Sequence, residues 1–295
     1  MNGEQTPTYV YVYAVAAPAP RLPALLPGVH GVEDAPVTLL APLDAAPGAP
    51  AFVTSRVPAT HWSEDVLRTR FEDLAWLEGT ARAHHHVVEV LAAHTTVLPL
   101  RIATLYRDDD RALAALREQR PAFAERLALF ARHTEYGVKA YVAPDPPDPP
   151  GPGAPAPEAG TGTASPAPPS PGKAYLQARR AQHHAREDRY RQAGRAAERI
   201  AATAARYATR AVRHPAQTGP LGRGERGERG ENVLNDAYLV PDDLADAFRT
   251  AVMETVRDLP GVRVEVTGPW APYSFATLPV PPAPTGTAET PGPRP

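Results

Sequence analysis

Hydrophobic and polar residues follow two different periods along this chain, and the changes of period predict both strands and helices. Residues 8–16, TYVYVYAVA, form a Tyr- and Val-rich run bounded by polar and proline residues, which is typical of a β-strand. Two more strands are predicted in APVTLLAPL and AFVTSRV, which the turn-forming DAAPGAP separates. From Ser63 to Leu91 the apolar residues instead recur mostly every three or four positions. This spacing predicts one amphipathic helix with Ser63 as its N-cap.

The period changes again before the middle of the chain. The run TVLPLRIATLY (96–106) predicts a strand, residues 108–133 a helix that breaks near Pro121, and residues 134–142 a closing strand. The resulting order β-β-β-α-β-α-β predicts an N-terminal α+β domain with a mixed sheet, covering residues 1–142.

Proline marks the domain boundaries. The chain contains 37 prolines, far above the roughly 5% of average protein composition. They are concentrated in residues 143–172, which have no aromatic or branched aliphatic side chain to bury, and again in the tail 279–295. Such segments cannot offset the entropy of ordering, so we predict a disordered linker and a disordered tail.

The second half of the chain predicts a smaller α+β domain over residues 173–278. Residues 173–213 are rich in Ala and Arg with few large apolar side chains, which predicts a long charged helix. A strand (232–241), a helix (242–259) and another strand (261–270) follow. A helix followed by β-α-β is half of a ferredoxin-like motif, so we expect a ferredoxin-like C-terminal domain.

Composition excludes several kinds of chemistry. The chain has no cysteine, which excludes disulfides and thiolate sites, and it shows no membrane-length apolar run, so we expect a cytoplasmic protein without a membrane span. No serine lies in a nucleophile elbow, and no carboxylate pair stands out. We therefore expect no catalytic residues, no enzyme activity and no cofactor.

Three consecutive histidines, His84, His85 and His86, are the strongest metal candidate. On a helix they point in directions about 100° apart, whereas helical metal ligands are spaced by three or four residues. Only His85 or His86 with Glu89 makes a facing pair. We therefore interpret them as partly buried structural histidines and expect no metal site.

The predicted helix 173–213 is the strongest candidate for nucleic-acid binding. It contains 11 Lys or Arg residues and 3 acidic residues, which could neutralise phosphates. However, no interleaved aromatic residues or known binding module accompany the cations. We favour a solvated or protein-binding helix and keep a nucleic-acid-binding protein as the alternative.

Two places are candidates for contact with a protein partner. Trp270, Tyr273 and Phe275 lie in a proline-stiffened segment, where they either cap the core of their own domain or form a binding patch. Arg101 alternates with Leu100 and Ile102 in the predicted strand, so its guanidinium faces the other way, toward a surface ion pair or a partner.

Several of these segments together resemble the gas vesicle accessory proteins of the GvpF/GvpL type. The matching segments, in the order of that family, are YVYVYAV, LAWLEGTARAHHHVVEVLAAHTTVLPLRIATLY, EYGVKAYV, ENVLNDAYLVP and VEVTGPWAPYSF. They cover most of residues 8–142 and 173–278. The chain departs from the family pattern in its long proline-rich linker and in having three histidines where the family has one, at the position of His84.

The resemblance implies a two-domain α+β protein with a ferredoxin-like C-terminal part and no catalytic residues. It also implies a minor component or assembly factor of gas vesicles. Such a protein would bind the small hydrophobic shell protein, and possible further accessory proteins, and limit premature aggregation while a vesicle nucleates.

Overall fold

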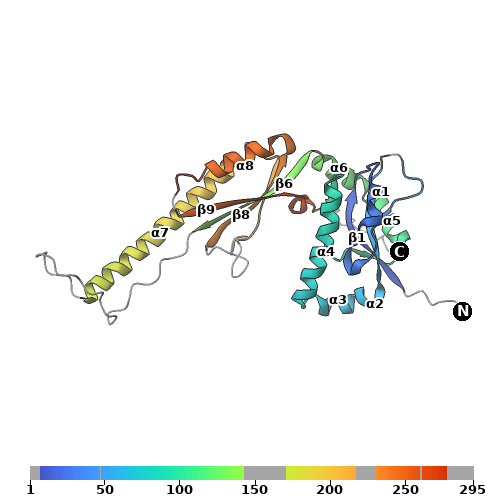
Figure 1. Ribbon diagram of the computed structural model, residues 1–295, viewed down its shortest axis with the longest axis horizontal. Helices are drawn as coiled ribbons and strands as arrows, with labels where there is room; N and C mark the ends of the chain where they lie inside the picture. Colours follow the sequence, from blue (N-terminus) through green and yellow to red (C-terminus); the bar gives the residue numbers. More distant parts are fainter. Residues whose placement is uncertain (1–6, 47, 143–170, 217–229, 260, 278–295) are drawn as a thin grey trace, which may run out of the picture. The chain divides into compact units, whose positions relative to one another are not determined.

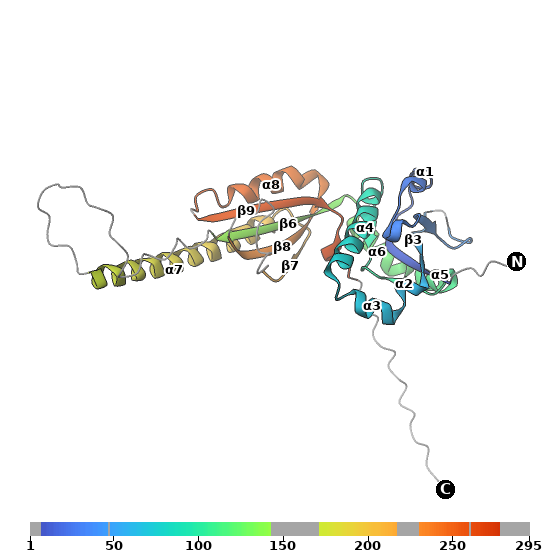
Figure 2. The same ribbon diagram turned by 60° about the horizontal axis from the view of Figure 1, so that its bottom comes forward.

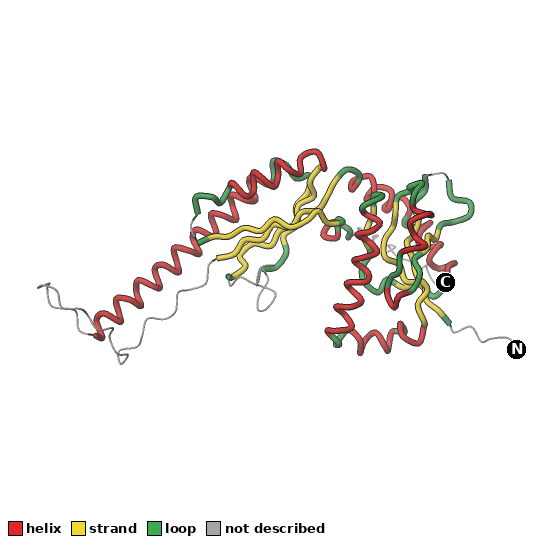
Figure 3. Tube along the Cα trace, viewed as in Figure 1, coloured by secondary structure: helices red, strands yellow, loops and turns green. Residues whose placement is uncertain are grey.

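The computed structural model describes residues 7–46, 48–142, 171–216, 230–259 and 261–277. The chain divides into unit 1, Met1–Leu129 with Tyr273–Pro295, and unit 2, Phe130–Pro272. Each unit holds an antiparallel sheet with helices, which confirms the α+β class (Figure 3). The predicted tail lies outside the described residues, as does the predicted linker except for its last two residues.

Unit 1 is built on a sheet with the strand order β2-β3-β1-β4, and β5 also pairs with β1. All of these pairings are antiparallel, so the prediction of a mixed sheet was wrong. The elements of unit 1 are β1 (Thr8–Ala16), α1 (Leu22–Leu25), η1 (Leu26–Gly28), η2 (Val32–Asp34), β2 (Thr38–Leu40), β3 (Ala51–Pro58), α2 (Ala59–Trp62), α3 (Glu64–Arg70), α4 (Leu74–Ala92), β4 (Val97–Pro99), β5 (Leu105–Tyr106), α5 (Asp109–Glu118), α6 (Arg120–Phe130) and η5 (Tyr273–Phe275).

The central strand β1 is buried on both faces, with seven consecutive buried residues from Val10 to Ala16. On one face the ring of Tyr11 lies 5.7 Å from that of His84 on α4. On the other face, Phe52 of β3 packs edge-on against Phe123 of α6, with ring centroids 5.8 Å apart. Because helices cover both faces, the strand reads as an almost continuous Tyr and Val run.

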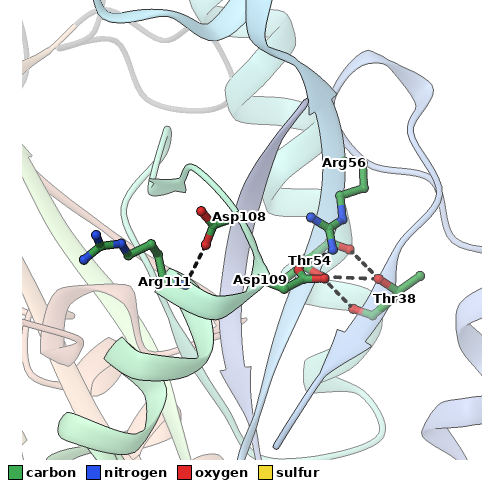
Figure 4. Close-up of polar contacts among 6 residues, drawn as sticks. All are labelled: Thr38, Thr54, Arg56, Asp108, Asp109 and Arg111. Carbon is green, nitrogen blue, oxygen red and sulfur yellow. Dashed lines mark hydrogen bonds and ion pairs between the residues drawn. The ribbon is translucent and has the colours of Figure 1, made fainter. Parts of the chain in front are cut away.

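Polar contacts attach β2 and α5 to the strand β3 (Figure 4). The Thr38 and Thr54 hydroxyls lie 3.3 Å apart across the β2–β3 pair. Arg56 of β3 forms an ion pair with Asp109 in the first turn of α5. Asp108 caps this helix by accepting a hydrogen bond of 2.8 Å from the Arg111 N–H, which satisfies one of the free donors at the helix start.

The single helix predicted from Ser63 is instead two helices, α3 and α4. Asp73 adopts extended dihedral angles and accepts hydrogen bonds from the N–H groups of Ala75 and Trp76, so a new helix starts after it. The break leaves Phe71 and Leu74 exposed, although the continuous-helix interpretation placed them on the apolar face.

Unit 2 contains a four-stranded antiparallel sheet with the order β7-β8-β6-β9. The strand at 134–142 was predicted to close the first sheet. In the structure it lies between β8 and β9 in this second sheet instead. Its long register with β8, which no local pattern could reveal, explains the difference. The elements of unit 2 are β6 (His133–Val142), α7 (Pro171–Ala204), β7 (Arg210–Arg213), β8 (Glu231–Pro241), η4 (Asp242–Leu244), α8 (Ala245–Glu254) and β9 (Val262–Trp270).

Helices α7 and α8 cover the same face of the second sheet (Figures 1 and 2). The three alternating valines of β9 point to this face, as their spacing predicted, with Val264 buried and Val262 and Val266 packed against the cluster. The buried cluster consists of Tyr136, Val138, Ala140, Ala196, Ile200, Ala204, Leu234, Tyr238, Val240, Phe248, Val252, Val256 and Val264.

The predicted helix 173–213 is shorter in the structure, because α7 ends at Ala204 and Arg210–Arg213 pair with β8 as strand β7. Only the C-terminal part of α7 is buried, and its N-terminal part extends past the sheet of its own unit (Figure 1). None of the helices in the described ranges combines the length and apolar character that a bilayer crossing requires.

Candidate partner-binding groove

A groove with a volume of about 430 Å³ opens on unit 1. It combines apolar side chains with a cation and hydroxyl groups, a composition suited to binding a partially apolar segment of another chain. Two of the four predicted partner residues line it. The lining residues are Pro99, Leu100, Arg101, Thr104, Tyr273, Ala276 and Thr277.

One wall of the groove is a turn, although a continuous strand was predicted over 96–106. Strand β4 ends at Pro99, and Ala103 adopts a left-handed conformation with a φ of 61°, which an extended strand does not allow. The carbonyl of Arg101 accepts hydrogen bonds from the Thr104 N–H (3.2 Å) and hydroxyl (2.7 Å). Arg101 therefore lies in a turn and not in the alternating strand that was predicted, and its side chain is exposed at the groove.

Hydrogen bonds between buried polar groups hold this turn against the core of unit 1. The Tyr11 hydroxyl accepts a hydrogen bond of 3.2 Å from the Ala103 N–H and lies 2.9 Å from Nδ1 of His84 on α4. Burial lowers the pKa of His84 from 6.5 to about 4, although the backbone of Leu100 acts in the opposite direction. His84 is therefore neutral, and if the Tyr11 hydroxyl donates to Nδ1, the proton of the ring is on Nε2. Through Tyr11, the network connects α4 and β1 to the turn that carries Arg101.

The other wall consists of η5 and the residues that follow it, with Tyr273, Ala276 and Thr277 in the lining. The Tyr273 hydroxyl lies 3.3 Å from Nδ1 of His85, and the Nε2 of His85 lies 3.0 Å from a carboxylate oxygen of Glu89. Phe275 is buried and so anchors the segment, while Arg126 donates a hydrogen bond of 3.2 Å to the carbonyl of Thr277. Tyr273 is thus half-buried, and its contact with His85 of α4 positions it in the groove.

The three adjacent histidines take three different environments. His84 is a core residue, His85 forms the pair with Glu89 that its spacing predicted, and His86 is exposed. In the described part of the chain, no three His, Asp or Glu side chains are grouped so that they could hold a metal ion.

The structure separates the three aromatic residues that the sequence grouped together. Tyr273 lines the groove, and Phe275 is buried beneath its own segment. Trp270 belongs to unit 2, at the end of β9, with 37% of its surface exposed and its indole N–H 3.3 Å from the Thr267 hydroxyl. Arg101 and Tyr273 are therefore the two predicted residues that share one surface.

Comparisons with known proteins agree over nearly the whole chain. The family model described as gas vesicle synthesis protein GvpL/GvpF matches residues 9–277. Gas vesicle protein L of Streptomyces sp. (strain CB03234) is 37% identical over 269 residues, which is 91% of this chain and 92% of that protein. Gas vesicle protein F of the same strain is 35% identical over 131 residues, 44% of this chain and 47% of that protein.

Solved structures share the fold. The crystal structure of the gas vesicle protein GvpF from Anabaena sp. PCC7120 matches with a TM-score of 0.58 and 16% identity, covering 92% of this chain and 98% of that one. GvpF from Microcystis aeruginosa matches with a TM-score of 0.55 and 16% identity, covering 92% and 99%. With the family model spanning both units, this chain belongs to the GvpL/GvpF family of gas vesicle proteins.

Proposed function

We propose that this gas vesicle-associated protein is a non-catalytic assembly factor and minor vesicle component that works in the cytoplasm. It binds the hydrophobic shell protein and limits its aggregation during vesicle nucleation. The observation that carries the proposal is the groove of unit 1, where Arg101 and Tyr273 meet an otherwise mainly apolar lining in a member of a gas vesicle family.

The chemistry of the groove fits a partner of this kind. An aromatic ring such as Tyr273, held by His85 and by the buried Phe275, loses little conformational entropy when a partner covers it. Arg101 offers a planar set of donors for a carboxylate or carbonyl of the partner. Tyr and Arg are also residue types in which binding energy is often concentrated.

The test is to measure the affinity of the purified protein for shell protein kept in solution by a mild detergent. Replacing Tyr273 by Ala removes the ring from the groove, and Arg101→Glu reverses the charge at the rim. Each is expected to weaken binding at least tenfold, which corresponds to ~1.4 kcal/mol.

A matched control is Arg21→Glu, which reverses an exposed charge of unit 1 that does not line the groove. It is expected to leave binding unchanged. Equal affinities for the wild type, Tyr273→Ala and Arg101→Glu would rule the groove out, and no binding by the wild type would rule out the function itself.

We also infer that unit 2 is a ferredoxin-like domain. Its elements follow the order β-α-β-β-α-β once β6 is included, and the sheet order β7-β8-β6-β9 with both helices on one face supports this arrangement. Local patterns predicted only half of the motif, because they placed β6 in the N-terminal domain.

The alternative, a nucleic-acid-binding protein, depends on α7. The exposed N-terminal part of this helix carries Lys173, Arg179, Arg180 and Arg186, which favours contact with an anionic partner. Glu187 and Asp188 interrupt the cations, and this weakens the case. If duplex DNA is retained by the wild type and released by Arg180→Glu, the alternative gains support.

A further inference from the structure

Strand β9 forms one edge of the second sheet. Among the described residues it pairs with β6 alone, so the outward-facing N–H and C=O groups along its other side have no strand partner there. At nine residues it is much longer than β7, the four-residue strand at the opposite edge. A long free edge is a template for pairing with another strand unless the protein protects it.

In β9 the apolar residues are placed symmetrically about Val264, and the two residues beside it carry opposite charges. Arg263 and Glu265 flank this residue, and Val262 and Val266 follow on either side. If two β9 strands pair antiparallel with Val264 opposite Val264, each Arg263 faces the Glu265 of the other strand. The same register places Val262 opposite Val266 twice.

The neighbouring registers do not place opposite charges across from each other. Sliding the pair by two residues in one direction places Arg263 opposite Arg263, and sliding it in the other direction places Glu265 opposite Glu265. A parallel in-register pair also brings like charges together. Like charges directly opposite each other destabilise a strand pair, so the charge pattern selects the symmetric antiparallel register.

The Glu265 carboxylate is only partly satisfied within its own chain. One oxygen pairs with the Arg263 guanidinium of its own strand, while Oε2 is buried and has no hydrogen-bond partner in the described part of the chain, even though Lys139 lies opposite on β6. Arg263 is held in place over the ring of Tyr141, 4.4 Å from its centroid. A buried carboxylate oxygen without a partner is costly, and the guanidinium of a second copy would satisfy it.

We propose that β9 is a self-association edge, on which a second copy of this chain pairs antiparallel about Val264 to extend the sheet across two molecules. Pro269 has no N–H and limits the paired segment to the part of β9 before it. So short a contact makes the dimer reversible and dependent on concentration.

The test is sedimentation velocity of the full chain over a range of concentrations. The wild type is expected to form dimers as concentration rises. Arg263→Glu and Glu265→Arg each place like charges opposite one another in the dimer, and each is expected to weaken dimerisation at least tenfold. Arg210→Glu on the opposite edge strand is the matched control and is expected to dimerise like the wild type.

Mixing the two weakened variants separates pairing between copies from the ion pair within one strand. Both variants have lost the internal pair, yet together they place two cations opposite two carboxylates. The 1:1 mixture is therefore expected to recover dimers that neither variant forms alone. Circular dichroism of each variant confirms that it is folded before mixing.

Three results would overturn the proposal: a wild type that stays monomeric at all concentrations, a dimer that both variants retain, or folded variants whose mixture forms no dimer. If the wild type is monomeric while Glu265→Arg prevents shell-protein binding, the edge belongs to that partner instead. None of these outcomes depends on the groove of unit 1. The self-association proposal and the proposed function can therefore fail separately.

Discussion

Strands β1 and β9 show how differently the two units use a sheet. In β1, seven consecutive residues are buried between helices on both faces. In β9, only Val264 is buried, and the strand forms an edge. Unit 1 also buries the polar groups of Tyr11 and His84 beside β1, and Tyr11 accepts a hydrogen bond from the turn at the groove.

This difference indicates which residues are expected to stabilise the fold and which are expected to bind other molecules. Residues around β1 hold the fold, so changes there should be measured mainly as lost stability. The charged residues of β9 and the residues of the groove contribute little to the core, so changes there should mainly affect association.

Replacing Phe52 by Ala should cause the largest loss of stability. Phe52 is fully buried between the rings of Tyr106 and Phe123, and truncation leaves a cavity that the sheet cannot close. We expect the free energy of unfolding to fall by about 3–5 kcal/mol in equilibrium denaturation. A loss below about 1 kcal/mol would mean that this side of the sheet is not tightly packed.

The buried His84 should make stability depend on pH. Its pKa is about 4 in the folded state and 6.5 in a model peptide, so between these values the unfolded chain binds a proton that the native state does not. Stability should therefore fall as the pH decreases from 6.5 to about 4, by roughly 3 kcal/mol from this residue.

The variant His84→Gln isolates this contribution, because carboxylates titrate in both proteins. Denaturation of the wild type and the variant at the two ends of the range should show a smaller loss for the variant. Identical pH dependences would contradict a neutral, buried His84.

A pair of valine truncations compares the two strands directly. Val12→Ala removes two methyl groups from a fully buried site and should cost about 2 kcal/mol, whereas Val266→Ala, at a half-buried site, should cost about 1 kcal/mol. Equal costs, measured by denaturant unfolding, would show that β9 is packed as tightly as β1.

The smallest effect is expected for an exposed ion pair of unit 2. Arg199 lies 3.1 Å from Asp258, and both side chains are exposed, Arg199 by 44% and Asp258 by 69%. Arg199→Ala should change the free energy of unfolding by less than about 1 kcal/mol, because water and salt screen such pairs. A larger loss would mean that polar contacts at the surface of unit 2 contribute as much as those inside unit 1.

Much of the fold followed from local patterns. The strand at residues 8–16, the strand at 232–241 and the alternating valines from Val262 to Val266 were all predicted correctly, because their periodicity is strong. The helix break at Asp73 was missed because apolar spacing continued through it, although an aspartate before an apolar run is itself a start signal.

The long-range arrangement could not be predicted. Strand β6 pairs with β8 across a sequence separation of about a hundred residues and with β9 across a still larger one, and nothing in its own sequence identifies those partners. The groove brings the turn near Arg101 together with residues 273–277 in the same way. Arg101 and Tyr273 were identified for separate reasons, and Thr104, Ala276 and Thr277 carry no local signal that would have placed them beside these two.

The most direct test of the central claim is the light scattering of shell protein diluted out of detergent, with and without this chain. We predict that the wild type delays aggregation at a stoichiometric ratio and that the double variant Arg101→Glu, Tyr273→Ala, although folded, loses most of the delay, while Arg21→Glu keeps it. Aggregation that proceeds equally fast with the wild type, the double variant or no added protein would contradict the account.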